Sequence, residues 1–199
     1  MLLADLPPRG VTVAQLRDLV GEDGLLVFAA FLTLVFLVPV SIPGVSTVFG
    51  AAILLIGLSR LLDRGLWLPA RLARREVPTD RLRMALTQGL TWLHRLERLS
   101  RPGRLRRLVS GRLPGILNNG GLVLGAVLLM APFGLVPLSN TLPALAVLLL
   151  ALGQLQRDGV CVLLGHLANL VTVLYFAVLL AGGGLAVREL VRRLVDHSV

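Results

Sequence analysis

Hydroxyl and amide side chains follow two helix-breaking Pro/Gly turns in the most apolar parts of this sequence. After the first turn come Ser46 and Thr47. After the second come Asn140 and Thr141. Such residues cap helix N-termini, where free N–H donors and the helix dipole favour carboxylate or phosphate. The pattern predicts an anion site at the two breaks, although tight turns capped by Ser and Asn explain the same residues.

Charged residues lie where the helices that follow the two breaks are predicted to end. They are Arg60 and Arg64 after the first helix, and Arg157 and Asp158 after the second. The arginines would hold an anion at that end. Two such units, placed so that the breaks face each other, resemble the broken-helix sites of transporters.

No constellation of an enzyme stands out. The sequence has no HExxH, CxxC, GxSxG or Walker motif, and Cys161 is its single cysteine. His166 and Asn169 share a face of the last apolar run. Polar residues at membrane depth are often functional, but a hydrogen-bonded pair that packs helices explains them equally well. We expect no enzyme, no cofactor and no metal site; an enzyme acting on a lipid phosphate is the weaker reading, because the apolar runs lack acids.

The elements that must position these residues are apolar helices. Residues of hydrophobic type make up 55% of the 199, charged residues 16%, and the mean hydropathy is +0.82. Uncharged runs occupy Leu25–Ser59, Leu113–Gln156 and Gly159–Val187. Since a bilayer core takes about 20 apolar residues per helix, the sequence predicts an all-α, polytopic membrane helical bundle.

An internal repeat is predicted from self-similarity. A shift of 94 residues aligns Pro43–Gly65 with Pro137–Gly159 without a gap, and eight of the 23 positions are identical. Each unit has an apolar helix (Leu25–Val38, Ile116–Met130), a break, and a second apolar helix of only about 14 to 17 residues. Helices this short thin the bilayer or belong to re-entrant hairpins. Close helix approach is expected at Gly57, Gly121 and Gly125.

The segment between the repeats is strongly basic. All 20 basic residues are Arg, 14 of them lie from Arg60 to Arg112, and only four acids accompany them, so that segment carries +10 against +9 for the whole chain. By the positive-inside rule it is cytoplasmic. Its apolar stripe at helical spacing predicts helices lying in the membrane surface; a solvated helix hairpin on the membrane domain is the alternative. The predicted surface residues are Trp92, Arg95, Arg98, Arg104, Arg106 and Arg107.

The sequence leaves two topologies open for the ends of the chain. A short amphipathic helix is expected at Val11–Val20, and the N-terminus does not read as a cleavable signal peptide. Five full crossings would place the basic tail outside the cell, whereas re-entrant second helices would place it inside. The predicted organisation is an N-terminal amphipathic segment (1–24), first repeat (25–65), Arg-rich insert (66–112), second repeat (113–159), last span (160–187) and basic tail (188–199).

Three stretches carry a family resemblance: IPGVSTVFGAAILLIGLSRLLDRGLWLPARLARR (Ile42–Arg75), WLHRLERLSRP (Trp92–Pro102) and NTLPALAVLLLALGQLQRDG (Asn140–Gly159). They resemble the ExoD family of exopolysaccharide synthesis proteins. The similarity covers about Val11 to Leu180. The family often has a Phe-Gly step before the second-break Asn, where this chain has Leu138–Ser139.

The resemblance implies a bacterial inner-membrane protein linked to exopolysaccharide production, but supplies no reaction. Our leading hypothesis is recognition or translocation of a phosphate-bearing lipid, such as a polyprenyl-linked saccharide or a phospholipid, at the facing breaks. The alternative is a scaffold for glycosyltransferase or polymerase components. Expected partners are membrane lipids with anionic headgroups and other exopolysaccharide biosynthesis proteins; a homo-oligomer is left open, and no nucleic acid is expected.

Overall fold

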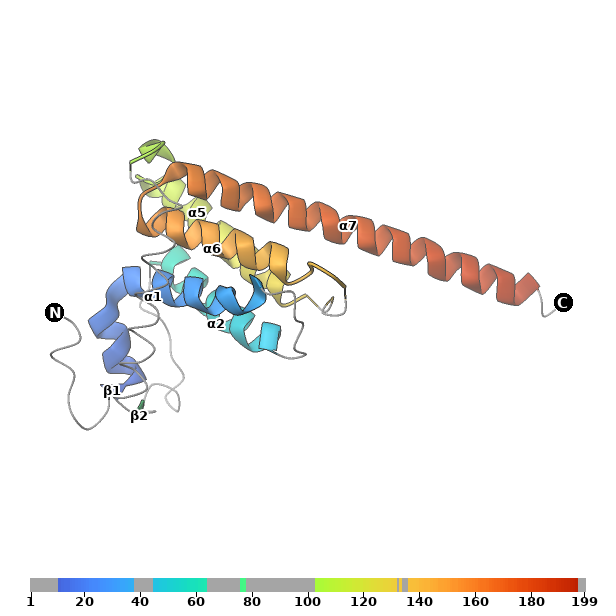
Figure 1. Ribbon diagram of the computed structural model, residues 1–199, viewed down its shortest axis with the longest axis horizontal. Helices are drawn as coiled ribbons and strands as arrows, with labels where there is room; N and C mark the ends of the chain where they lie inside the picture. Colours follow the sequence, from blue (N-terminus) through green and yellow to red (C-terminus); the bar gives the residue numbers. More distant parts are fainter. Residues whose placement is uncertain are drawn as a thin grey trace.

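A computed structural model describes residues 11–37, 45–63, 76–77, 103–131, 133 and 136–196. For residues 11–20, 22, 45, 76–77 and 184–196 it describes only the backbone. This part of the chain is all-α, apart from one antiparallel pairing of two-residue strands (Figure 1). The elements are β1 (Val11–Thr12), α1 (Val13–Leu37), α2 (Val45–Leu61), β2 (Glu76–Val77), the 3-10 helix η1 (Arg106–Leu108), α5 (Arg112–Leu129), α6 (Thr141–Leu155) and α7 (Gly159–Asp196). The predicted all-α class is confirmed.

Helix α1 consists of two helical portions separated at one glycine. Gly21 has φ 64° and ψ −166°, a conformation that side-chain-bearing residues rarely adopt. The portion after it contains the apolar helix Asp23–Leu37. Gly21 lies between the helix expected at Val11–Val20 and the apolar helix expected from Leu25; the division of the chain into segments stays a prediction.

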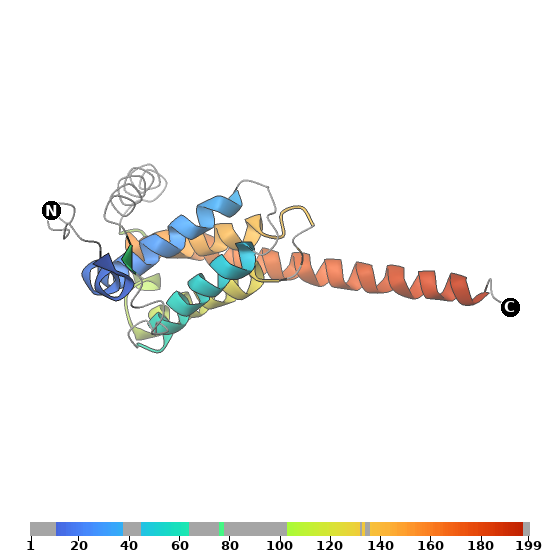
Figure 2. The same cartoon turned by 90° about the horizontal axis from the view of Figure 1, so that it is seen from below.

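Four helices form two hairpins that point the same way. Helices α1 and α2 are antiparallel, as are α5 and α6, and both connections lie at the same end of the bundle (Figures 1 and 2). The first helix of each hairpin packs on the second helix of the other: α1 on α6, and α2 on α5. In this part of the chain the two units are not inverted with respect to each other. The predicted duplication itself stays a prediction.

The second helix of each hairpin is short, as expected. Helix α2 has 17 residues and α6 has 15. At 1.5 Å per residue, α6 is about 22 Å long, below the roughly 30 Å of a bilayer core. The two helices end at Leu61 and Leu155, residues that are 94 positions apart.

Glycines let the helices approach closely where the sequence predicted it. A Cβ on Gly121 would lie 2.7 Å from Cε1 of His166, and one on Gly125 would lie 2.7 Å from Cγ2 of Val147. On α2, a Cβ on Gly57 would lie 3.0 Å from Cγ2 of Val123. These contacts confirm the expected close packing of α5 on α2, α6 and α7.

The outer surface of the bundle is apolar. Large hydrophobic side chains are exposed on every described helix of the bundle, among them Phe28, Leu55, Leu117, Leu145 and Leu167. Two helices have the length and composition to cross a membrane, Arg112–Leu129 and Gly159–Gly183, within the residues that the structure describes. Multiple crossings remain a prediction.

Helix α7 is much longer than its neighbours. It runs for 38 residues, about 57 Å, and packs on α6 along its first half (Figures 1 and 2). Its second half projects beyond the bundle. The same helix continues from the predicted last span (160–187) into the predicted basic tail, as far as Asp196.

Candidate functional site

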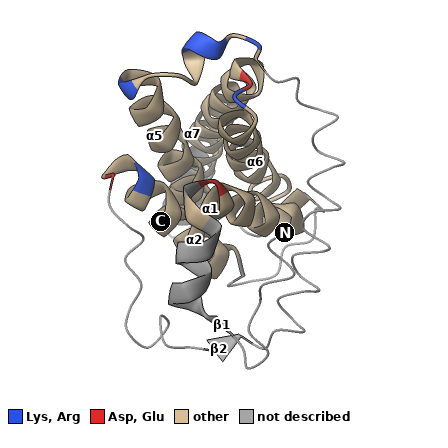
Figure 3. Cartoon of the chain, turned by 90° about the vertical axis from the view of Figure 1, so that its left-hand side faces the viewer, with Lys and Arg blue, Asp and Glu red and all other residues tan. Residues whose placement is uncertain are grey.

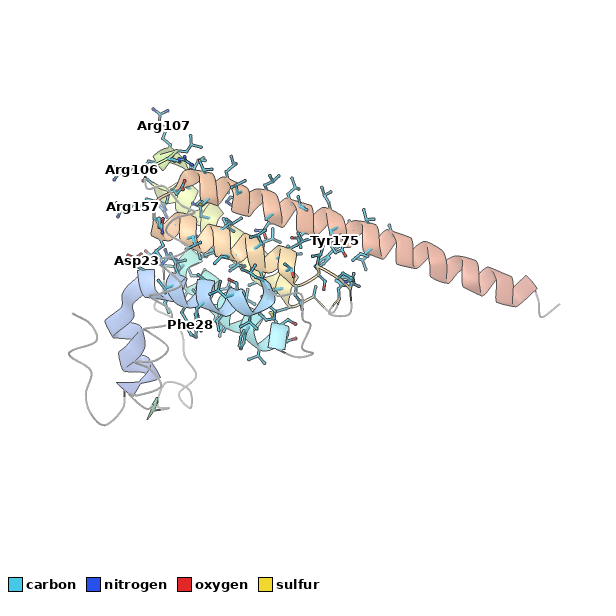
Figure 4. The ribbon with its side chains drawn as sticks, in the orientation of Figure 1. Asp23, Phe28, Arg106, Arg107, Arg157 and Tyr175 are labelled. Carbon is cyan, nitrogen blue, oxygen red and sulfur yellow. The ribbon has the colours of Figure 1, made fainter. Side chains whose placement is uncertain are left out.

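The described charged side chains gather at one end of the bundle, which we call the charged end. At this end lie Asp23 of α1, the end of α2, the start of α5 and the junction between α6 and α7 (Figure 3). Figure 4 shows Asp23, Arg106, Arg107 and Arg157 at this end, and Tyr175 far from it. The charged residues are Asp23, Arg60, Asp63, Arg104, Arg106, Arg107, Arg112, Arg157 and Asp158. We call the opposite end, where α1 meets α2 and α5 meets α6, the break end.

At the break end the two predicted capping positions differ. Helix α6 begins at Thr141 with Asn140 at the N-cap, as predicted, although the Asn140 side chain makes no capping hydrogen bond. Helix α2 begins at Val45. Ser46 and Thr47 therefore lie in its first turn, and their predicted N-cap position is wrong. Asn140 is buried, whereas Thr47 is exposed.

The predicted ligand residues fall into two separate groups. Arg60 follows Ser46 by 14 residues of one helix, about 21 Å. Arg157 and Asp158 lie beyond the far end of the helix that starts at Thr141. One phosphate cannot contact both groups. Arg64, Trp92, Arg95 and Arg98 lie outside the described residues.

Asp158 caps helix α7. Its carboxylate is 1% exposed, and Oδ1 accepts a hydrogen bond of 2.9 Å from the N–H of Val160. The thiol of Cys161 donates to Oδ2 at 3.5 Å. A carboxylate at a helix N-terminus satisfies free N–H groups and interacts favourably with the dipole. Asp158 therefore stabilises the α6–α7 junction, and both of its carboxylate oxygens accept hydrogen bonds there.

The loop before α5 is pressed onto the start of α7. The N–H of Gly159 donates to the carbonyl of Arg104 at 2.7 Å. A Cβ on Gly159 would collide with the carbonyl oxygen of Leu105, which lies in the left-handed region with φ 44°. This backbone contact holds Arg104, Arg106 and Arg107 next to the α6–α7 junction, and all three side chains are exposed.

Two adjacent asparagines of α5 link it to three other elements just inside the charged end. Asn118 donates from Nδ2 to the carbonyl of Leu108 at 2.9 Å, and its Oδ1 lies 3.1 Å from Nε2 of His166. Asn119 accepts from Nε of Arg60 on α2 at 3.4 Å. Both are buried, at 3% and 9% exposure. We did not single out this pair from the sequence; an Asn-Asn step inside an apolar run was the available signal.

Three further polar side chains continue along α7 from His166. Asn169, 2% exposed, donates from Nδ2 to the carbonyl of Gly121 at 2.9 Å. Thr172, also buried, donates to the carbonyl of Ala168 at 2.7 Å. The hydroxyl of Tyr175 donates to the carbonyl of Pro137 at 2.7 Å, at the break end. His166 and Asn169 do contact α5, as a helix-packing pair would.

Comparison with known proteins identifies the chain's relatives. Residues 2–178 match the family described as "Exopolysaccharide synthesis, ExoD". The chain is 48% identical over 178 residues to "Protein ExoD" of Rhizobium meliloti (strain 1021), covering 89% of this chain and 74% of that protein. It is 30% identical over 192 residues to "Uncharacterized protein slr1875" of Synechocystis sp., covering 92% and 88%. No solved structure matches.

The fold and the site define an all-α protein of apolar helices with one charged end, at least two of whose helices can cross a membrane by length and composition. The extent of the family match and the 48% identity then assign the chain to a family. The chain belongs to the ExoD family of exopolysaccharide synthesis proteins. The resemblance noted from its sequence is confirmed.

Proposed function

We propose that this chain is a multi-pass inner-membrane protein that serves exopolysaccharide synthesis or export by binding the phosphate of a lipid headgroup, without catalysing a reaction. The observation that carries the proposal is the segregation of charge. Exposed arginines gather at one end of the bundle, and exposed leucine and valine side chains cover its sides. No charged side chain that the structure describes lies at the break end, although the backbone of α7 continues past it with Arg188, Arg192 and Arg193.

The segregation also suggests an orientation. Arginine-rich connections remain on the cytoplasmic side of a membrane. Leu105, Leu108 and Leu113 are exposed among the arginines of the charged end. Apolar and basic side chains interleaved in this way suit the boundary between acyl chains and phosphates. The charged end would thus lie at the cytoplasmic headgroup level, and the break end would point outward.

The two hairpins support an internal duplication. Asp63 and Arg157, 94 residues apart, both have left-handed φ values, 51° and 53°. The hydrogen bonds that close the two helices correspond as well: Leu62 N–H to Leu58 O and Gln156 N–H to Leu152 O, at 3.0 and 2.9 Å. Equivalent helix ends with equivalent backbone geometry are what a duplicated hairpin predicts.

The charged end suits a phosphate better than the break end does. A phosphate carries negative charge that cations stabilise, and guanidinium groups match its oxygens in geometry. Arg104, Arg106 and Arg107 are exposed on one short connection, with Arg112 and Arg157 at the adjoining helix ends. At the breaks, the described polar groups near the helix starts are neutral: Ser46 and Thr47, and Ser139 and Asn140.

Binding to soluble, short-chain phosphate lipids tests the proposal. Full-length protein in phosphatidylcholine nanodiscs is titrated with dihexanoyl phosphatidylglycerol and, separately, with farnesyl phosphate. We expect saturable binding that weakens with salt. Replacing Arg104, Arg106 and Arg107 together by Gln should weaken it about 100-fold, at roughly 1 kcal/mol per arginine. The control Ser46→Ala/Thr47→Ala should leave affinity unchanged; the opposite pattern would return the site to the breaks.

A scaffold function remains the second candidate, because the same exposed Arg and Leu side chains suit a protein partner. A scaffold predicts that neither lipid binds, and that the triple Gln variant instead loses co-purification with glycosyltransferase or polymerase components. Titration and co-purification of the same variant therefore separate the two functions.

A further inference from the structure

The helices that start or end at the charged end differ greatly in length. Helices α2, α5 and α6 have 17, 18 and 15 residues, so that none is longer than about 27 Å. The uncharged stretch of α7 starts at the charged end, at Gly159, and continues to Val187, about 43 Å away. A bilayer has a hydrocarbon core of roughly 30 Å, and measures roughly 40 to 45 Å with its headgroups. Helix α7 is therefore long enough to cross the whole bilayer, whereas the bundle is shorter than the hydrocarbon core.

The charged end cannot make up this difference by moving into hydrocarbon. Arg104, Arg106 and Arg107 are exposed there. A guanidinium group in hydrocarbon is costly, so these side chains hold the charged end at the level of the headgroups. Helix α6, about 22 Å long, then ends about 8 Å short of the opposite edge of the hydrocarbon core. The missing length lies at the break end.

The part of α7 beyond the bundle is too apolar to stand in water. Ala177 and Val178 are exposed, as are the residues from Leu180 to Gly183. No described element lies beside this part of the helix (Figures 1 and 2). The next charged residue along α7 is Arg188. Because apolar surface is unfavourable in water, this part of α7 crosses the hydrocarbon that the bundle does not reach.

Hydrocarbon cannot cover the break end itself. Helices α1 and α5 end there and α2 and α6 begin there, and each helix terminus leaves four backbone groups without partners inside the helix. The Asn140 side chain does not cap α6, and Thr47 and Leu138 are exposed. Non-helical backbone at membrane depth is tolerated only where protein or water covers it. Polar surroundings must therefore reach this level.

The single tyrosine of the chain lies at the same level. Tyr175 is about 24 Å along α7 from Gly159, and its hydroxyl donates to the carbonyl of Pro137 at 2.7 Å. Tyrosine is enriched where a membrane meets water. This one instead lies well before Arg188, inside the uncharged stretch of α7. A headgroup layer that meets the break end would account for its position.

We propose that the protein thins the membrane at its break end. Lipid headgroups and water reach Thr47, Leu138 and Tyr175, while α7 borders this thinned region and crosses a membrane of ordinary thickness. Membrane segments shorter than the hydrocarbon core are commonly accommodated by thinning. The break end is then an interaction surface, and its partner is the headgroup layer of the leaflet opposite the charged end. The inference rests on the multi-pass placement of the proposed function, but not on phosphate binding at the charged end.

Quenching of a fluorophore by spin-labelled lipids tests the thinning. In a Cys161→Ala background, Leu138→Cys and Leu180→Cys are labelled with bimane; both native residues are exposed. Each full-length protein is reconstituted in dioleoyl phosphatidylcholine vesicles with phosphatidylcholine that carries a nitroxide either on its headgroup or midway along its acyl chain. We expect roughly threefold stronger quenching by the headgroup nitroxide at position 138, and by the chain nitroxide at position 180. Position 180 is the farther of the two from the charged end.

Two further labels serve as matched controls. Ser110→Cys at the charged end should be quenched more by the headgroup nitroxide, and Leu167→Cys, on α7 beside the bundle, more by the chain nitroxide; both native residues are exposed. In vesicles of shorter-chain dimyristoleoyl phosphatidylcholine, position 180 should shift toward headgroup quenching and position 138 should not change. A position 180 that does not respond to chain length would contradict the inference.

The remaining outcomes each overturn the thinning for a different reason. Stronger chain quenching at position 138 would place the break end in hydrocarbon. Stronger headgroup quenching at position 180 in dioleoyl vesicles would show that the bundle spans the bilayer and that α7 stands in water beyond it. Weak quenching of position 138 by both lipids would show that no headgroup contacts the break end. Titration with farnesyl phosphate reports on the charged end alone, so the proposed phosphate site and the thinning can fail independently.

Discussion

The two ends of the bundle are held together in different ways. At the charged end the joint is backbone against backbone, since Gly159 N–H bonds Arg104 O and Asp158 caps α7. At the break end the contacts are softer: Met130 covers Gly50, and the rings of Phe133 and Phe176 lie 4.7 Å apart. The difference suggests a rigid platform for binding at one end and an adaptable rim at the other.

The largest expected effect comes from adding a Cβ at Gly159 of the charged end, and Gly50 at the break end provides the comparison. Gly159→Ala should lower the free energy of unfolding by about 3 kcal/mol, because its Cβ meets a backbone carbonyl that cannot move alone. Gly50→Ala should cost less than about 1 kcal/mol, because the atom it meets belongs to the flexible Met130 side chain. Thermal unfolding of the purified variants measures both. Equal losses would remove the distinction between the ends.

Next in size is Asn118→Leu, which preserves approximate volume and removes two hydrogen bonds. Leaving the carbonyl of Leu108 and the ring of His166 without this partner should cost about 2 kcal/mol. The conservative Asn118→Gln retains the amide and separates lost bonding from changed shape. A stability equal to wild type in the Leu variant would show that the contact between Asn118 and His166 does not hold α5 to α7.

The cap of α7 should have a smaller effect. Asp158→Ala should destabilise the protein by about 1 kcal/mol, since it removes the hydrogen bond to Val160 N–H. Asp158→Asn should be close to wild type, because Asn caps as well as Asp. If the Asn variant loses as much as the Ala variant, the charge rather than the capping bond is what the junction needs.

The smallest effect belongs to the break end. Tyr175→Phe removes one hydrogen bond to the carbonyl of Pro137 and leaves the ring contacts with Phe176. We expect a loss of about 0.5 to 1 kcal/mol. A loss larger than that of Asp158→Ala would mean that the break end is the more tightly held of the two.

Much of the fold was predictable because it depends on local signals. Pro/Gly breaks, long uncharged runs and charged helix ends predicted two hairpins with short second helices, and α2 and α6 end at equivalent residues. Glycines at helical spacing predicted close packing. These signals lie within a few residues of the features that they specify.

The site was less predictable because its contacts join distant positions. Asn118 and His166 are 48 residues apart, and no local pattern pairs them. Arg60 and Ser46 lie in one short segment, yet a helix between them sets them at opposite ends. Asp158 resembles an anion-site residue by its neighbours, but it caps α7 because that helix starts at the next residue. In all three cases the position of the side chain depends on where the helices start and end and on the direction in which they run.

The assignment of the charged end to the cytoplasm and of the break end to the outer side is tested most directly by cysteine accessibility. In a Cys161→Ala background, Ser110→Cys marks the charged end and Leu138→Cys the break end; both native residues are exposed. With a membrane-impermeant maleimide on intact spheroplasts, we predict labelling at position 138, and at position 110 only after permeabilisation. Labelling of both positions from the same side would contradict the proposed orientation.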